Sequence, residues 1–232
     1  MAETFDVTST DGVLDGLRAA RAALGRGELV VVPTDTVYGL AADAFRPEAV
    51  AALVAAKGRT LTSPPPVLVP DLATLDALAE HVHPAVRALV DALWPGPLTI
   101  IVPARSSLDW HLGETRGTVA LRMPDDPVAL QLLKDCGPLA VSSANRTGQP
   151  PAATGAAAVE ALGESVAVVL DGGPRGTLAS TIVDATNLDR PDGRLRIVRE
   201  GVVPSSRIAE LVTGLVAVHG AGDRAQDEGA VA

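Results

Sequence analysis

The stretch that decides the fold is GELVVVPTDTVYGL, residues 27–40, in which an apolar run is followed at once by polar side chains. Residues 29–32 are aliphatic without polar alternation, a pattern typical of a strand covered on both faces. Pro33 ends the hydrogen-bond ladder because it has no N–H to donate. Polar groups at such a strand end indicate a ligand site in α/β proteins, although a capped strand-to-helix turn gives the same pattern. The polar residues are Thr34, Asp35, Thr36 and Tyr38.

The composition is consistent with one α/β domain, and it argues against a general affinity for polyanions. The chain has 232 residues, of which 47% are apolar and only 2% aromatic, so Ala, Val, Leu and Ile must build the core. Aromatic platforms for stacking single-stranded nucleic acid are scarce. The net charge of -9 argues against nucleic acid or an anionic membrane as a general partner, so any phosphate site must be local.

Cysteine use and the two ends of the chain predict a cytoplasmic protein. Cys136 is the only cysteine, which excludes an internal disulfide and a cysteine-based zinc site and suits a reducing compartment. The N-terminus lacks the basic and apolar regions of a signal peptide, and no run approaches the ~20 apolar residues of a membrane span. Residues 1–216 are expected to form the domain, and residues 217–232, rich in Ala, Gly, Asp and Glu, a disordered tail.

Strands and helices interleave along the chain, which predicts an α/β layered fold with a mixed sheet flanked by helices. Helices are expected at about 11–24, 47–57, 72–80, 84–93, from 127, 155–162 and 204–215. Strands are expected at 29–32, 67–69, 98–102, 118–122, 139–141, 166–170, 180–184 and 195–198.

Lys57-Gly58-Arg59 places two cations at the end of a predicted helix. The chain has 17 arginines and only two lysines, Lys57 and Lys134, so a retained lysine stands out. The helix dipole favours cations there by ~0.3–1 kcal/mol, which explains the pair structurally. The functional alternative is an anion site, with lysine as a point charge and arginine as a bidentate fork.

Two further segments combine hydroxyl groups with turn residues. Residues 142–145, SSAN, follow a predicted strand and can hold a phosphate, bond a base or form an Asx turn. Residues 171–176, DGGPRG, form either an anion-binding nest or a hairpin loop ahead of Ser180. The chain has no P-loop and no nucleophile elbow, and its histidines lack metal-ligand spacing, so metal chemistry is disfavoured.

Taken in order, the motifs PTDTVYGL, KGR, WPGPLT, VALRMP, SSAN, STIVD and REG resemble those of the YrdC-like family, from about residue 11 to 212. The best-characterised members are L-threonylcarbamoyladenylate synthases, which are nucleotidyltransferases, and this chain is similar to the single-domain form. The resemblance implies a twisted mixed sheet with a concave basic cavity. It also implies the condensation of L-threonine, bicarbonate or CO2, and ATP to threonylcarbamoyl-AMP and pyrophosphate, for the threonylcarbamoyladenosine modification of tRNA.

The resemblance further implies cofactors and partners. Mg2+ is expected as the counter-ion of ATP rather than in a protein cage. The expected partners are ATP, L-threonine, bicarbonate and downstream tRNA-modification proteins, with a weak RNA contact, no membrane and a monomeric state. Because the carbamate attacks ATP directly, catalysis needs positioning and charge neutralisation but no covalent intermediate.

The resemblance also assigns site residues. The catalytic residues, which bind the ATP phosphates and the carbamoyl group, are Lys57, Arg59, Ser143 and Asn145. Further ATP contacts are expected from Ser63, Thr118 and Arg199. Threonine contacts are expected from Thr34, Arg122, Ser180 and the main chain at Val141. No residue is assigned to a metal.

Two departures from the family pattern concern Leu68, where many relatives have histidine, and Ala179, where they have glutamate. An imidazole contact to threonine is therefore absent or replaced by water or backbone. The alternative function is a non-catalytic nucleotide- or double-stranded-RNA-binding paralogue. The net charge and the complete Lys-Arg-Ser-Asn set weigh against it.

Overall fold

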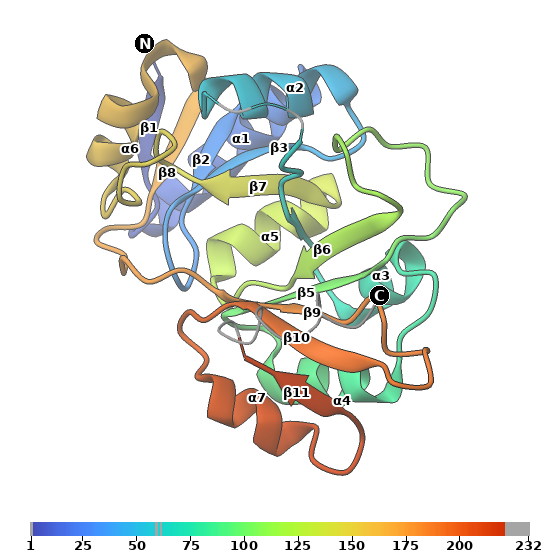
Figure 1. Ribbon diagram of the computed structural model, residues 1–232. Helices are drawn as coiled ribbons and strands as arrows, with labels where there is room; N and C mark the ends of the chain where they lie inside the picture. Colours follow the sequence, from blue (N-terminus) through green and yellow to red (C-terminus); the bar gives the residue numbers. More distant parts are fainter. Residues whose placement is uncertain (1, 59, 61, 221–232) are drawn as a thin grey trace.

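The computed structural model describes residues 2–58, 60 and 62–220. Within them, eleven strands form one twisted mixed sheet in the order β1-β8-β2-β3-β7-β4-β6-β5-β9-β10-β11, with helices packed against it (Figure 1). The strands are β1 Glu3–Asp6, β2 Val30–Val32, β3 Gly39–Asp43, β4 Val67–Leu68, β5 Leu98–Pro103, β6 Thr118–Arg122, β7 Leu139–Ser143, β8 Val168–Asp171, β9 Thr181–Asp184, β10 Arg194–Arg199 and β11 Ala217–His219. The predicted α/β mixed sheet is confirmed.

The helices predicted from the sequence are present, with ends that differ by a few residues. They are α1 Thr10–Gly25, α2 Pro47–Ala56, α3 Leu72–Leu78, α4 Pro84–Leu93, α5 Pro127–Cys136, α6 Gly155–Leu162 and α7 Ser205–Leu211, with a 3-10 turn η1 at Gly163–Ser165. None of the helices in the described residues has the length and apolar character needed to cross a bilayer.

Three strands were missed from the sequence, and one of them excludes the alternative interpretation of residues 33–38 as a strand-to-helix turn. These residues do not lead into a helix. They join β2 to β3, which pair antiparallel with Val32 opposite Gly39. The β3 sequence, GLAAD, has low strand propensity, but pairing with β2 on one side and β7 on the other buries it. Tertiary pairing therefore decides this strand.

The missed strand β11 shortens the predicted tail. It pairs in parallel with β10, Arg194 opposite Ala217, and the partly buried Val218 packs against the core. Its sequence is short and is followed by polar residues, so only the edge of β10 makes it a strand. The remainder of the predicted tail, from residue 221, lies outside the described residues. The third missed strand, β1, lies at the opposite edge beside β8.

One half of the sheet, formed by β1, β8, β2, β3 and β7, is covered on both faces, and we call it the covered half. On one face Val30 packs with Leu17 of α1 and Leu132 of α5. On the other face Val31 packs in a cluster with Leu53 of α2 and other residues of α2 and α6. Strands buried on both faces are expected to be continuously apolar, as the sequence predicted for residues 29–32.

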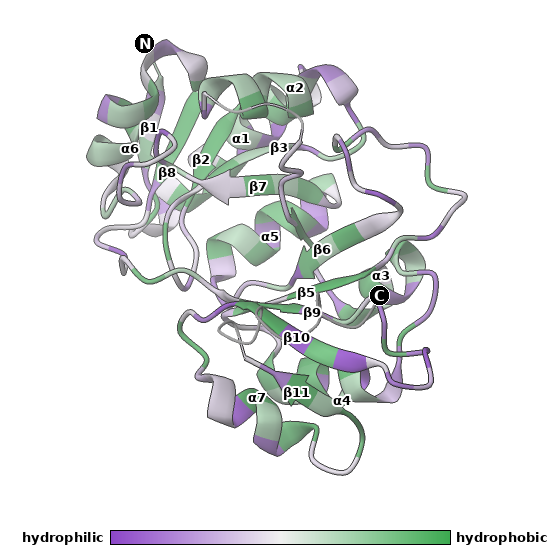
Figure 2. Cartoon of the chain, in the orientation of Figure 1, coloured by the Kyte–Doolittle hydropathy of each residue, from purple (hydrophilic) through white to green (hydrophobic). Residues whose placement is uncertain are grey.

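The other half, formed by β6, β5, β9 and β10, is covered on one face only, and we call it the open half. Ile100 packs there with Leu89 of α4 and Ile208 of α7. The next residue, Ile101, points to the opposite face, where its partners are Ala120 and Asp184. Several residues on that face, Ile101 and Ala120 among them, are only partly buried, and Figure 2 shows hydrophilic and hydrophobic residues alternating along β10.

Candidate active site

Three of the four predicted catalytic residues lie together where α2 ends beside β7. Lys57 follows the last turn of α2 and is only 1% exposed. Its Nζ donates to the main-chain oxygen of Asn145 at 2.6 Å and to Asn145 Oδ1 at 3.0 Å. It also donates to the main-chain oxygen of Ser143 and lies 3.3 Å from Ser143 Oγ. Arg59, the fourth member, lies outside the described residues.

Strand pairing brings the SSAN segment beside the PTDTVYGL segment. Ser143 is paired with Gly39, and the Ala144 N–H donates to the main-chain oxygen of Tyr38 at 2.7 Å. A Cβ on Gly39 would lie 2.5 Å from Cγ1 of Val141, so this close approach requires glycine. Two motifs about 100 residues apart are thereby joined as neighbouring strands.

The turn at residues 143–149 is closed by the Asn145 side chain. Its Nδ2 donates to the main-chain oxygens of Arg146, at 2.9 Å, and Gln149, at 2.6 Å. Its Oδ1 accepts from Lys57. The amide thus stabilises a turn, and the buried ammonium fixes the same turn from the other side. A buried ammonium requires such partners because its desolvation is costly.

A second cluster surrounds Arg122, at the C-terminal end of β6. The residue is 6% exposed, and its Nε donates to the main-chain oxygen of Gly96 at 3.0 Å. Its Nη1 donates to Thr36 Oγ1 at 2.9 Å, and its Nη2 lies 2.5 Å from Asp35 Oδ1. Burial lowers the pKa of Arg122, and the carboxylate of Asp35 opposes that effect. Two residues of the 33–38 loop and the Gly96 carbonyl therefore hold this guanidinium in place.

Thr34, the predicted threonine contact, shapes the turn from inside. It is 3% exposed, its Oγ1 donates to the main-chain oxygen of Val37 at 2.6 Å, and the Thr36 N–H donates to it at 3.2 Å. The sequence analysis assigned no substrate contact to Asp35 or Thr36. In the structure both side chains accept hydrogen bonds from Arg122. No local sequence pattern could have identified that partner for Asp35, because the two residues are 87 positions apart.

A third cluster joins Ser180 to Arg199. Nη2 of Arg199 donates to the main-chain oxygen of Ser180 at 2.8 Å, and its Nε does so at 3.2 Å. The Ser180 and Thr99 hydroxyls lie 2.8 Å apart. Burial lowers the pKa of Arg199, and Arg199 in turn contributes to lowering the pKa of Arg122. The second and third clusters are therefore close enough for their guanidinium groups to repel each other.

A β-bulge in β10 puts Arg199 on the partly covered face of the open half. Arg196 is opposite Asp184 and Ile197 is opposite Val183, but Arg199 is opposite Ile182. The one-residue shift moves Arg199 from the side of buried Ile197 to the side of Arg196.

Gly201, the last residue of the REG motif, allows the chain to pass close to the segment before β9. A Cβ on it would lie 2.2 Å from the main-chain oxygen of Ala179. Backbone packing therefore occupies the region around Ala179, where relatives have glutamate.

The remaining predicted contacts are Thr118, Ser63 and the main chain at Val141. Thr118 begins β6, four residues before Arg122 and so about 13 Å along the strand, and its hydroxyl donates to the main-chain oxygen of Thr115 at 2.8 Å. Ser63 is exposed in the loop before β4. The Val141 N–H donates to the main-chain oxygen of Pro66 at 2.8 Å.

Leu68, which replaces the histidine of relatives, is 4% exposed and packs in the core cluster that includes Leu132 of α5. It is opposite Arg122 in the β4–β6 pair. Polar partners for Arg122 come instead from the 33–38 loop and the Gly96 carbonyl.

Tyr38 tethers the 33–38 loop to the loop after β8. The residue is fully buried, and its hydroxyl lies 2.8 Å from Asp171 Oδ1 and 2.6 Å from the main-chain oxygen of Gly173. The Gly172 N–H donates to it at 3.0 Å. Burial, together with Asp171, raises the pKa of Tyr38. We therefore assign this tyrosine a structural role.

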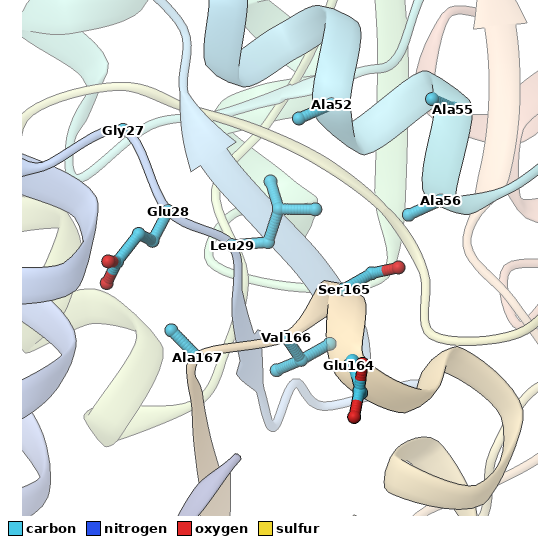
Figure 3. A pocket seen from close by; sticks show the side chains of 10 residues that line it. All are labelled: Gly27, Glu28, Leu29, Ala52, Ala55, Ala56, Glu164, Ser165, Val166 and Ala167. Atoms are coloured by element: carbon cyan, nitrogen blue, oxygen red, sulfur yellow. The ribbon is translucent and has the colours of Figure 1, made fainter. Parts of the chain in front are cut away.

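The pocket in Figure 3 lies away from these clusters, between α2 and the segment around η1. It has a volume of about 560 Å³ and is lined by small and apolar residues together with Glu28 and Glu164. Its lining includes no basic residue, so it does not suit a triphosphate.

Comparisons with known proteins agree with the motifs. The family model for Sua5, YciO and YrdC, described as "Telomere recombination", matches residues 22–201. The chain belongs to this family. A Mycobacterium tuberculosis protein named "Putative threonylcarbamoyl-AMP synthase" is 46% identical over 213 residues, which are 91% of this chain and 96% of that protein. The Bacillus subtilis threonylcarbamoyl-AMP synthase is 36% identical over 85% of this chain and 60% of its own length.

The fold also matches solved structures of Sua5 from Pyrococcus abyssi. A double mutant of that protein matches with a TM-score of 0.84 and 30% identity over 94% of this chain and 62% of that chain. The complex of the same protein with L-threonine matches with a TM-score of 0.76 and 31% identity over 88% of this chain and 58% of that chain. The family and the fold predicted from the motifs are thereby confirmed.

Proposed function

We propose that this chain is a threonylcarbamoyl-AMP synthase, which condenses L-threonine, bicarbonate or CO2, and ATP to threonylcarbamoyl-AMP and pyrophosphate. The observation that carries the proposal is the convergence of motif residues from distant segments. Lys57 from α2 bonds Ser143 and Asn145 after β7, and Arg122 from β6 bonds the turn that begins at Thr34. The relatives named above support the same activity.

The proposed chemistry needs positioned charges rather than a nucleophilic side chain. The threonine amine attacks the carbon of CO2, forms an N–C bond and loses a proton to give a carbamate. A carbamate oxygen then attacks the α-phosphorus of ATP while the bond to the bridging oxygen breaks, and pyrophosphate leaves. Such a reaction is accelerated by fixed geometry and by cations that stabilise the charge on phosphate oxygens.

The residues divide the substrates between them in this proposal. Lys57 supplies positive charge beside the phosphates and the carbamoyl group while it holds the turn, Ser143 offers its hydroxyl there, and Asn145 fixes the same turn. Arg199 adds a cation for phosphate. Arg122 takes the threonine carboxylate, since only three of its five N–H groups donate within the described part of the chain. The roles of Arg59, Ser63, Thr118 and Ser180 remain predictions.

Mg2+ fits this proposal as an ion carried by ATP. The described residues contain no group of three or more His, Cys, Asp or Glu side chains arranged to hold a metal. Mg2+ commonly binds nucleotide phosphates and water with only one or two protein carboxylates. Bound there, it would neutralise charge on the phosphates. We further propose that tRNA-modification proteins use the product.

Pyrophosphate release from the purified protein tests the function. Release is expected only when ATP, L-threonine and bicarbonate are all present, and mass spectrometry is expected to detect threonylcarbamoyl-AMP. Omission of each substrate in turn is the control. RNA binding at ~0.15 M salt without threonine-dependent turnover would support the paralogue instead.

A further inference from the structure

We infer that Asp35 and Arg122 act together as a recognition pair for the zwitterionic head of a free α-amino acid, with Oδ2 of Asp35 receiving the ammonium group. Arg122 receives the carboxylate. The inference rests on the proposed function for the identity of the substrate. It makes Asp35 a residue that determines substrate specificity.

The two oxygens of Asp35 are used differently. Oδ1 accepts from Arg122 Nη2 at 2.5 Å and from the Asp125 N–H at 3.0 Å. Oδ2 accepts no hydrogen bond in the described part of the chain, and the side chain is 13% exposed. Asp35 is an exposed residue in the loop, although its side chain is largely covered. Oδ2 is therefore the unpartnered oxygen of a side chain that remains partly accessible.

Arg122 has complementary capacity. Its Nε and one N–H from each of Nη1 and Nη2 donate to Gly96, Thr36 and Asp35 respectively. Two N–H groups of the fork remain for a ligand in the described structure, the number that a carboxylate binds side by side. The pair thus presents two donors next to one anionic acceptor.

The charges of the pair match a zwitterionic ligand better than a ligand that carries only a carboxylate or only an ammonium group. Together Arg122 and Asp35 are neutral, so a ligand that carries only a carboxylate places its charge beside the carboxylate of Asp35. A ligand that carries only an ammonium meets the guanidinium instead. Leaving one of these charged groups unmatched in a mostly buried site weakens binding, which is how such sites reject analogues.

Neighbouring contacts hold Asp35 rigidly. The Asp125 N–H that it accepts lies just before α5, whose first turn is capped by Asp126 Oδ1. Asp126 Oδ2 lies 3.1 Å from Nη2 of Arg175. Asp35 is thus fixed between the end of β6 and the start of α5, and a fixed carboxylate can discriminate between ligands.

The test compares L-threonine with 3-hydroxybutanoate, the same skeleton without the amine, by calorimetry at constant salt. The wild-type protein is expected to bind L-threonine at least ~10-fold more tightly. In Asp35→Asn, which keeps the shape but removes the charge, we expect the ratio of the two affinities to fall toward one. Asp35→Glu, which restores the carboxylate, is expected to recover part of the ratio.

Asp184→Asn is the matched control, because it also neutralises an aspartate with a largely covered side chain paired with an arginine, Arg196, but leaves Asp35 and its contacts intact. Its affinity ratio is expected to equal that of the wild type. An unchanged ratio in a folded Asp35→Asn would overturn the inference while leaving the proposed function standing. Equal binding of the two ligands by the wild type would overturn it without any variant. Absence of threonine binding by the wild type would contradict the proposed function itself.

Discussion

The covered and open halves of the sheet differ in how their sequences are patterned. In the covered half, β2 is three consecutive valines and β7 begins Leu-Ala-Val, because both faces are buried. In the open half, β10 reads RLRIVR and buries only alternate residues. The covered half supplies a frame for the cluster of Lys57, Ser143 and Asn145 and for the 33–38 loop at its rim, whereas the open half carries Arg122, Ser180 and Arg199 at or beside its strands.

Because of this difference, we expect substitutions in the covered half to change stability and substitutions in the open half to change the chemistry of the site. A substitution inside the covered half changes packing on two sides, whereas one on the partly covered face of the open half changes what a ligand meets. Four experiments test that separation.

Lys57→Met is expected to have the largest effect, since it keeps the length of the side chain and removes the ammonium shared by Ser143 and Asn145. Threonine-dependent pyrophosphate release should fall about 100-fold or more, as for loss of one positioned charge stabiliser. Lys134→Met, on the exposed side of α5, is the control and should leave the rate unchanged. Wild-type rates in both variants would contradict the proposed site.

Adjacent residues of β5 give the sharpest comparison of the two faces. Ile100 is fully buried against α4 and α7, whereas Ile101 lies on the partly covered face. Ile100→Ala should lower the free energy of unfolding by about 2–5 kcal/mol and Ile101→Ala by about 1 kcal/mol. Urea unfolding at 25 °C measures both. Equal losses would show that the second face is covered as well as the first.

Two arginines of β10 allow a residue of the proposed site to be compared with a residue of the surface. Arg199 donates to Ser180 and is proposed to bind phosphate, whereas Arg196 forms an exposed ion pair with Asp184 at 2.8 Å. Arg199→Ala should raise KM for ATP about 10-fold, because a charged hydrogen bond contributes about 1.5–3 kcal/mol. Arg196→Ala should change it less than about 2-fold, as expected of an exposed pair. Equal increases would place both residues on the nucleotide.

The pH dependence of the alkylation of Cys136, which lies at the end of α5 under the covered half, tests the burial of its thiol. Burial raises the pKa of its thiol to about 11. Because only the thiolate reacts, raising the pKa slows alkylation at neutral pH, and the rate should climb until the pH approaches 11. In urea, where the ordinary pKa of about 8.5 returns, iodoacetamide at pH 8 should react faster by about 100-fold. Equal alkylation rates with and without urea would show that the Cys136 thiol is not buried in the folded protein.

The sequence predicted the helices well because their signals are local. Pro47 opens α2, and Asp126 with Pro127 opens α5, as expected from residues that favour the first turn of a helix. The missed strands β1, β3 and β11 lack strong local signals and form only because a neighbouring strand pairs with them. The boundary of the expected tail was wrong for the same reason.

The candidate site was predicted in part. Motif residues Lys57, Ser143 and Asn145 were assigned to one group, and the structure brings them into contact. The pairing of Arg122 with Asp35 was not predicted, because Asp35 lies in the loop between β2 and β3, and two other strands, β7 and β4, separate β3 from β6 in the sheet. Sequence reasoning also treated Lys57 as a cation at a helix end, whereas the structure buries it.

By itself, the sequence determined the succession of strands and helices, the apolar strand before Pro33, and the set of cations and hydroxyls available for a phosphate site. Only the tertiary structure decided which of these groups meet. Helix caps and apolar runs act over a few residues, so a short window contains their cause. The contacts of Arg122, Tyr38 and Lys57 depend on strand order and twist, and the face on which Arg199 lies depends on the bulge before it; these are properties of the sheet and not of a short segment.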